Sequence, residues 1–133
     1  MQRDKEGCGF ACVAVVTGKS YKDIKEQADE LNVVNIDDTL CTDAQDLIKL
    51  LSINGVMALD GRKAKYWENL PDLSIAGINY RKSENKWHWV VFIRTETDSY
   101  VLDPWHKIKT KKRRDFGRMR LRSAIPIVPN NTP

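Results

Sequence analysis

Apolar positions in the first half of the chain recur with the spacing of helices. Residues 8–17 (CGFACVAVVT) are apolar on nearly every side, which predicts a helix buried in the centre of the protein. Ser20 offers an N-cap with Asp23 three residues later, and the pattern that follows predicts an amphipathic helix over 21–31. Residues 42–55 repeat this arrangement, with a capping pair at the start and Asn-Gly at the end. We therefore expect three helices before any sheet.

The period changes in the second half, where short runs of aromatic and β-branched residues replace the helical spacing. We expect strands at 56–59, 74–80, 87–93, 100–102 and 118–128. The run 87–93 (WHWVVFI) is the strongest of these signals, whereas 62–70 is ambiguous and allows a short helix. Helices followed by an antiparallel sheet indicate the α+β class. Since no repeat or linker divides the chain, we expect a single domain over 1–133.

Length and composition exclude several classes of protein. With 133 residues, 41% hydrophobic and 30% charged, the chain can bury a core without disulfides or a metal. Collagen-like, low-complexity and disordered classes do not fit this composition. No stretch approaches the roughly 18 to 20 apolar residues of a membrane span. Residues 2–7 are polar and do not resemble a signal peptide, so we expect a cytoplasmic protein, with secretion by a signal-peptide-independent route left open.

The three cysteines are Cys8, Cys12 and Cys41. An odd and small number in a chain of this size does not indicate a disulfide framework, and it makes a reducing compartment the default expectation.

Charge is distributed unevenly, although the net charge is only +4. The basic strip, residues 106–122, holds nine Lys or Arg and one acidic residue, which gives it +8 and leaves −4 for the rest of the chain. Such a strip is compatible with an anionic partner at 107–122. A solvated strand or loop is the simpler interpretation, and nucleic acid is not an expected partner because no nucleic-acid-binding motif accompanies the strip.

Four residues in order along the chain suggest thiol chemistry. Cys8 opens the buried helix, where the positive end of the helix dipole favours a thiolate. His88 lies in the strongest predicted strand and can serve as general base and acid. Asp103 ends the next predicted strand and, if the two strands pair, can orient the imidazole. Gln2 can donate a side-chain N–H to an oxyanion.

Each of these residues alone is compatible with an ordinary structural role, because buried cysteines and packed histidines are common. A metal site is a further alternative, since Cys8, Cys12, His88 and His106 supply two sulfurs and two imidazoles. Their spacing does not match the short ligand loops of structural zinc sites, so we expect neither a metal nor another cofactor.

The ordered set resembles the papain-like cysteine peptidases, specifically the bacteriocin-processing, double-glycine-leader peptidases. The matching segments are Gln2, Cys8-Gly9-Phe10-Ala11-Cys12, His88-Trp89-Val90-Val91 and Asp103-Pro104. The separations of 80 positions from Cys8 to His88 and 15 from His88 to Asp103 are close to those of that family. The resemblance covers nearly the whole chain.

The resemblance implies a papain-like fold and a cysteine peptidase acting on a peptide or protein. Cys8 would be the nucleophile, His88 the base and Asp103 its orienting partner, while Gln2 and the Cys8 backbone N–H would form the oxyanion hole. Cys12 would be structural. Two alternatives remain at this point: an effector or toxin domain that deamidates or transamidates a target protein, and a non-catalytic domain that binds a peptide.

Overall fold

The computed structural model describes residues 8–30, 44–83, 86–105 and 108–128. The helices of these ranges come first, as expected: α2 (Cys8–Thr17), α3 (Tyr21–Glu30) and α4 (Ala44–Ile53). The strands are β1 (Arg62–Lys63), β2 (Leu73–Arg81), β3 (Lys86–Arg94), β4 (Ser99–Trp105), β5 (Ile108–Arg113) and β6 (Leu121–Pro126). Two short 3-10 helices, η1 (Trp67–Asn69) and η2 (Phe116–Arg118), complete the order. The protein therefore has the expected α+β fold.

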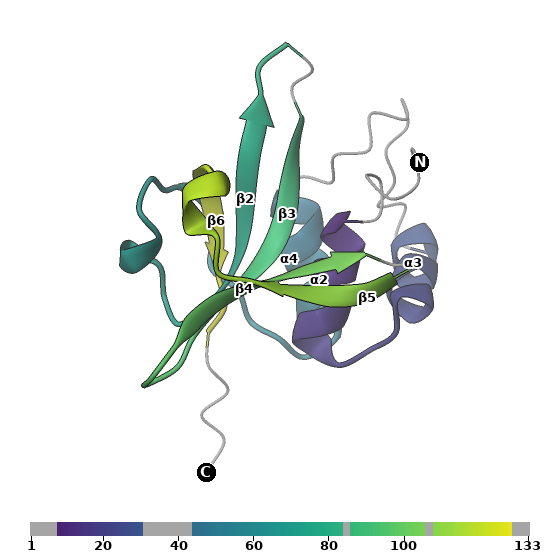
Figure 1. The fold of residues 1–133 in the computed structure, drawn as a ribbon. Helices are drawn as coiled ribbons and strands as arrows, with labels where there is room; N and C mark the ends of the chain where they lie inside the picture. Colours follow the sequence, from purple (N-terminus) through teal and green to yellow (C-terminus); the bar gives the residue numbers. More distant parts are fainter. Residues whose placement is uncertain (1–7, 31–43, 84–85, 106–107, 129–133) are drawn as a thin grey trace.

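The strands form one antiparallel sheet in the order β1-β6-β2-β3-β4-β5. Strand β3 lies between β2 and β4, and its partners run from Ile78 opposite His88 to Leu73 opposite Ile93 on the β2 side. Strands β1 and β5 form the two edges of the sheet. Figure 1 shows the three helices gathered on one side of this sheet, with the β4–β5 hairpin passing in front of them.

The main hydrophobic core lies between the helices and the sheet. Helix α2 contributes Phe10, Cys12 and Val13, which are buried against Trp89 and Val91 of β3. Because α3, α4 and the sheet surround α2, an all-apolar sequence is stable there and the helix needs no polar face. The packing fixes the start of α2 relative to β3.

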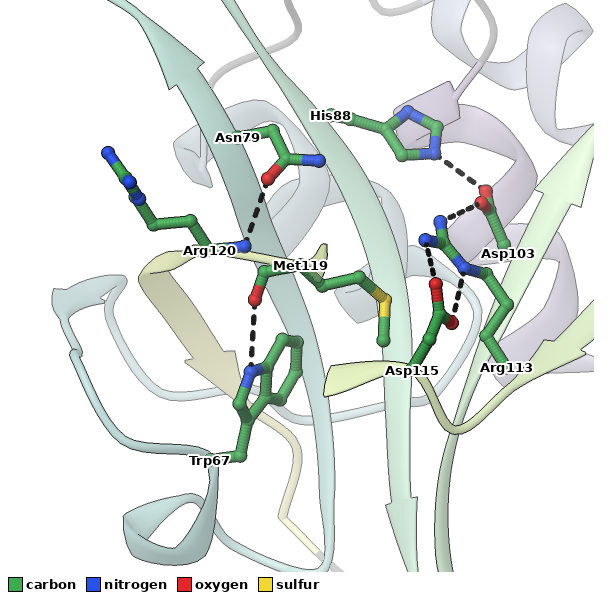
Figure 2. A network of polar contacts seen from close by, with 8 residues as sticks. All are labelled: Trp67, Asn79, His88, Asp103, Arg113, Asp115, Met119 and Arg120. Atoms are coloured by element: carbon green, nitrogen blue, oxygen red, sulfur yellow. Dashed lines mark hydrogen bonds and ion pairs between the residues drawn. The ribbon is translucent and has the colours of Figure 1, made fainter. Parts of the chain in front are cut away.

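A second core covers the opposite face of the sheet and is closed by the two 3-10 helices. Phe92 is buried there against Trp67 of η1, whose indole Nε1 donates to the Met119 carbonyl at 3.2 Å (Figure 2). Arg94 fastens η1 to β3 by donating to the carbonyls of Leu70 at 2.7 Å and Trp67 at 3.1 Å. Charged hydrogen bonds from one side chain thus hold this segment in place.

The expected helices are confirmed within the described ranges. Helix α2 spans 8–17 as predicted, and the Asp23 amide donates to Ser20 Oγ at 3.0 Å, the predicted N-cap of α3. Gly55 ends the α4 segment with a positive φ of 81°, a conformation that glycine adopts without strain. Thr42, the cap predicted for α4, and residue 31, the last position predicted for α3, lie outside the described residues.

The strand predictions needed correction at several places. Residues 56–59 form only an isolated bridge between Ala58 and Ile127 instead of a full strand. Val56 and Ala58 pack against the main core, whereas Met57 and Leu59 are exposed. The ambiguous 62–70 contains both β1 and η1, and the last strand starts at Leu121 rather than 118 because η2 precedes it. Strand β5 lies in the basic strip, which is interpreted above as a solvated strand or loop; its bounds were not predicted because its sequence lacks an apolar pattern.

Candidate active site

The candidate site lies where β3 and β4 cease to pair with each other. Their last paired residues are Val91 and Leu102, and His88 and Asp103 both lie beyond this pair. In this region, where the two strands no longer pair, His88 Nε2 and Asp103 Oδ1 are 2.6 Å apart (Figure 2). The expectation that the two strands are neighbours and that Asp103 faces His88 is met by this geometry.

The contact determines which imidazole nitrogen carries a proton. An ionised carboxylate can only accept hydrogen bonds, so Nε2–H of His88 must donate to Asp103. In the neutral imidazole, Nδ1 is then the basic nitrogen, able to take a proton from a nucleophile. The His88 side chain is 25% exposed and that of Asp103 only 7%, so the orienting contact is largely screened from water.

The environment keeps Asp103 ionised. Burial alone would raise the pKa of its carboxyl, but hydrogen bonds and charge from His88 and Arg113 outweigh this effect, and the pKa lies below its ordinary value. A buried carboxylate that stays negative is what an orienting partner for a histidine requires.

Arg113 at the end of β5 is the residue that the sequence analysis missed. Its Nη1 donates to Asp103 Oδ2 at 2.9 Å, while Nε and Nη2 donate to the two oxygens of Asp115 at 3.0 and 2.8 Å (Figure 2). The paired arginine lowers the pKa of Asp115 to about 2, and the pKa of Arg113 is itself raised, chiefly by Asp115. Arg113 is paired with Val101, two residues before Asp103 on β4, so strand alternation places both side chains on one face.

The thiol half of the expected site is placed only by its backbone. Cys8 is the first residue of α2, and α2 packs against β3, the strand that carries His88. The Cys8 side chain and Gln2 lie outside the described residues, as does Cys41. Cys12 is completely buried in the main core, which agrees with the structural role expected for it.

Several of the described cations in the basic strip make contacts within the protein. Lys112 lies 4.3 Å from the centre of the Tyr100 ring, Arg114 forms an ion pair with Asp98, and Arg122 stacks on Tyr80. These contacts, together with those of Arg113, agree with the simpler interpretation of the strip as part of a strand and its flanks. Side chains 106–111 lie outside the described residues.

Neither metal-binding clusters nor long helices occur in the described ranges. No three His, Cys, Asp or Glu side chains of these ranges gather as metal ligands would. The described helices are 10 residues long, whereas a bilayer span takes about 20 residues.

Comparison with known proteins agrees with the architecture. The protein-family model of the peptidase C39 family matches residues 1–129, almost the full length of the chain. A comparison with curated proteins finds no match. The members of the matched family are cysteine peptidases, hydrolases that act on peptides or proteins. The helices and antiparallel sheet described above are consistent with the papain-like fold of this family. This chain therefore belongs to the peptidase C39 family of cysteine peptidases.

Proposed function

We propose that the protein hydrolyses a peptide bond with a Cys8–His88–Asp103 triad. Cys8 acts as the nucleophile, His88 as general base and acid, and Asp103 as the partner that orients the imidazole. The side-chain N–H of Gln2 and the backbone N–H of Cys8 stabilise the oxyanion. The observation that carries the proposal is the 2.6 Å contact between His88 Nε2 and a buried Asp103.

The first half of the reaction forms an acyl-enzyme. His88 Nδ1 takes the proton of the Cys8 thiol, and the thiolate attacks the substrate carbonyl carbon to form a C–S bond. The carbonyl oxygen becomes an oxyanion held by the two N–H donors. When the intermediate collapses, the C–N bond breaks and His88 returns its proton to the leaving amine.

The second half releases the acid product. Water attacks the thioester carbon while His88 accepts one of its protons, and the C–S bond then breaks. The His88 imidazolium then returns this proton to the Cys8 thiolate, so the enzyme recovers its starting state. Asp103 keeps its charge throughout and stabilises the imidazolium that forms in each half.

The location of Cys8 supports its role as nucleophile. A helix N-terminus favours negative charge at its first residues, and α2 carries no charged side chain that would offset this effect. The main core holds α2 against β3, so the helix end and the His88 strand belong to one packed unit.

The proposal is tested first without any substrate. Iodoacetamide at pH 6 labels accessible thiolates, and tryptic mass spectrometry tells the three cysteines apart. We expect Cys8 to be labelled rapidly in the native protein and much more slowly in His88→Ala, whereas Cys12, which is completely buried, should resist labelling in both. An equal rate of Cys8 labelling in the native protein and in His88→Ala would contradict the proposal.

The second test uses a mixed-sequence peptide library analysed by mass spectrometry. Cleavage should disappear in Cys8→Ala and persist in Cys41→Ala, the matched control. A mass change of about 1 Da on a protein target with the backbone intact would indicate a deamidase instead, because replacing an amide by an acid changes the mass by this amount. Binding of peptides without any turnover would indicate a non-catalytic domain.

A further inference from the structure

We propose that Arg113 is a positioning residue of the active site, fixing the Asp103 carboxylate so that its other oxygen faces His88. The inference rests on the proposed function, because it assigns Arg113 a task in the Cys8–His88–Asp103 triad. The geometry is specific: Asp103 presents Oδ1 to His88 at 2.6 Å and Oδ2 to Arg113 at 2.9 Å. With both oxygens engaged, the carboxylate cannot rotate without losing a charged hydrogen bond.

Arg113 is itself held in position. Asp115 receives two hydrogen bonds from it, through Nε at 3.0 Å and Nη2 at 2.8 Å. This bidentate contact fixes the plane of the guanidinium and aims the remaining Nη1 at Asp103 (Figure 2). The order of contacts is therefore His88, Asp103, Arg113, Asp115, running from β3 through β4 and β5 to the segment before η2.

Burial makes this arrangement effective. The Asp103 side chain is 7% exposed and that of Arg113 21%, while Asp115 is 41% exposed and opens to solvent. Water can therefore replace Arg113 at Asp103 only in part. A lysine at this position would supply one point charge without the two-sided fork, so it could not bind both carboxylates in the same way.

Among the side chains that the structure describes, few charged groups surround Asp103, so the effect of a substitution there is easier to interpret. His88 faces it from β3 and Arg113 from β5, Asp115 contacts Arg113, and Arg118 of η2 acts on Asp115. Helix α2, which packs on this part of the sheet, contains no charged residue. Removing Arg113 thus takes away a hydrogen bond and a positive charge that lower the pKa of Asp103.

The test compares Arg113→Met and Arg113→Lys with Arg114→Met, a neighbouring control that breaks the exposed pair with Asp98 and a contact with the Tyr100 ring, neither of which involves Asp103. The readouts are the Cys8 alkylation rate between pH 4 and 8 and, with a cleavable peptide, kcat and KM. We expect Arg113→Met to lower both kcat and the alkylation rate at pH 6 by about tenfold or more, at nearly unchanged KM. In this variant the loss of the alkylation rate at low pH should also begin at a higher pH, because Asp103 is protonated more easily. Arg113→Lys should recover part of the loss.

Asp115→Asn provides a second variant should Arg113→Met fail to fold, as judged by circular dichroism. It keeps Arg113 but weakens the bidentate contact, and should shift the pH at which this loss begins in the same direction by a smaller amount. If the folded Arg113 or Asp115 variants match Arg114→Met in rate and pH profile, the positioning role is overturned. If Cys8→Ala and His88→Ala also leave the rate of peptide cleavage unchanged, the proposed triad is wrong.

Discussion

Replacing Asp103 by Asn should inactivate the protein by changing the tautomer of His88. Arg113 has only N–H donors, so the amide oxygen of Asn must face it at the position of Oδ2. The amide NH₂ then faces His88 Nε2, which can accept its hydrogen bond only when it carries no proton. The imidazole proton moves to Nδ1, and that nitrogen can no longer take the proton of the thiol.

The expected loss is large because the base is present but in the wrong form. Loss of the correct tautomer in a catalytic triad costs about 10³- to 10⁴-fold in rate, equivalent to roughly 4 to 5.5 kcal/mol of barrier. Both hydrogen bonds of residue 103 can still form, and the one from Arg113 keeps its charged donor, so the cost in stability should be only about 1 to 3 kcal/mol. The site should therefore lose function while the fold remains.

The assay measures Cys8 alkylation at pH 6 and peptide cleavage, with the ¹⁵N spectrum of His88 reporting the tautomer. The double variant Asp103→Asn/Arg113→Met removes the donor that orients the amide, so part of the Nε2–H tautomer should return. Full alkylation and cleavage rates in Asp103→Asn would refute the reasoning. An unchanged ¹⁵N pattern in that variant would refute the tautomer explanation in particular.

Three further predictions concern stability, measured by urea unfolding. Arg94→Met removes the donors that fasten residues 67–70 to β3, and should lower the free energy of unfolding by about 2 kcal/mol. Leu50→Ala, at a fully buried position of α4, should cost about 2 to 5 kcal/mol, whereas Ile53→Ala at a half-exposed position should cost well under 1 kcal/mol. Because folding lowers the pKa of Asp103, its stabilising contribution is complete above the ordinary value of 3.8 and is lost as pH falls further; Asp103→Asn should flatten this acid dependence.

Elements with a strong local signal could be predicted from the sequence. The all-apolar run of α2, the Ser20 cap and the aromatic run of β3 each satisfy one rule of periodicity or capping, and all three occur as expected. The pair His88 and Asp103 was also predictable, because two adjacent strands joined by a short turn generally form an antiparallel pair.

Arg113 and β5 could not be predicted for a physical reason. The sequence of β5, IKTKKR, has neither alternating apolar residues nor a turn signal, because an edge strand needs to bury little. Its arginine was indistinguishable from the other cations of the basic strip until the β4–β5 pairing placed it beside Asp103. The function of that residue depends on tertiary register, which a charge count does not contain.

The charges of β5, which lies at the edge of the sheet, affect how readily two molecules of the protein associate. An edge strand exposes unpaired N–H and C=O groups that can pair with the edge of a second molecule. Four of the six residues of β5 are Lys or Arg, so two such edges repel each other on approach. Self-association through this edge should therefore be suppressed at low ionic strength and become easier as added salt screens the lysines and arginines.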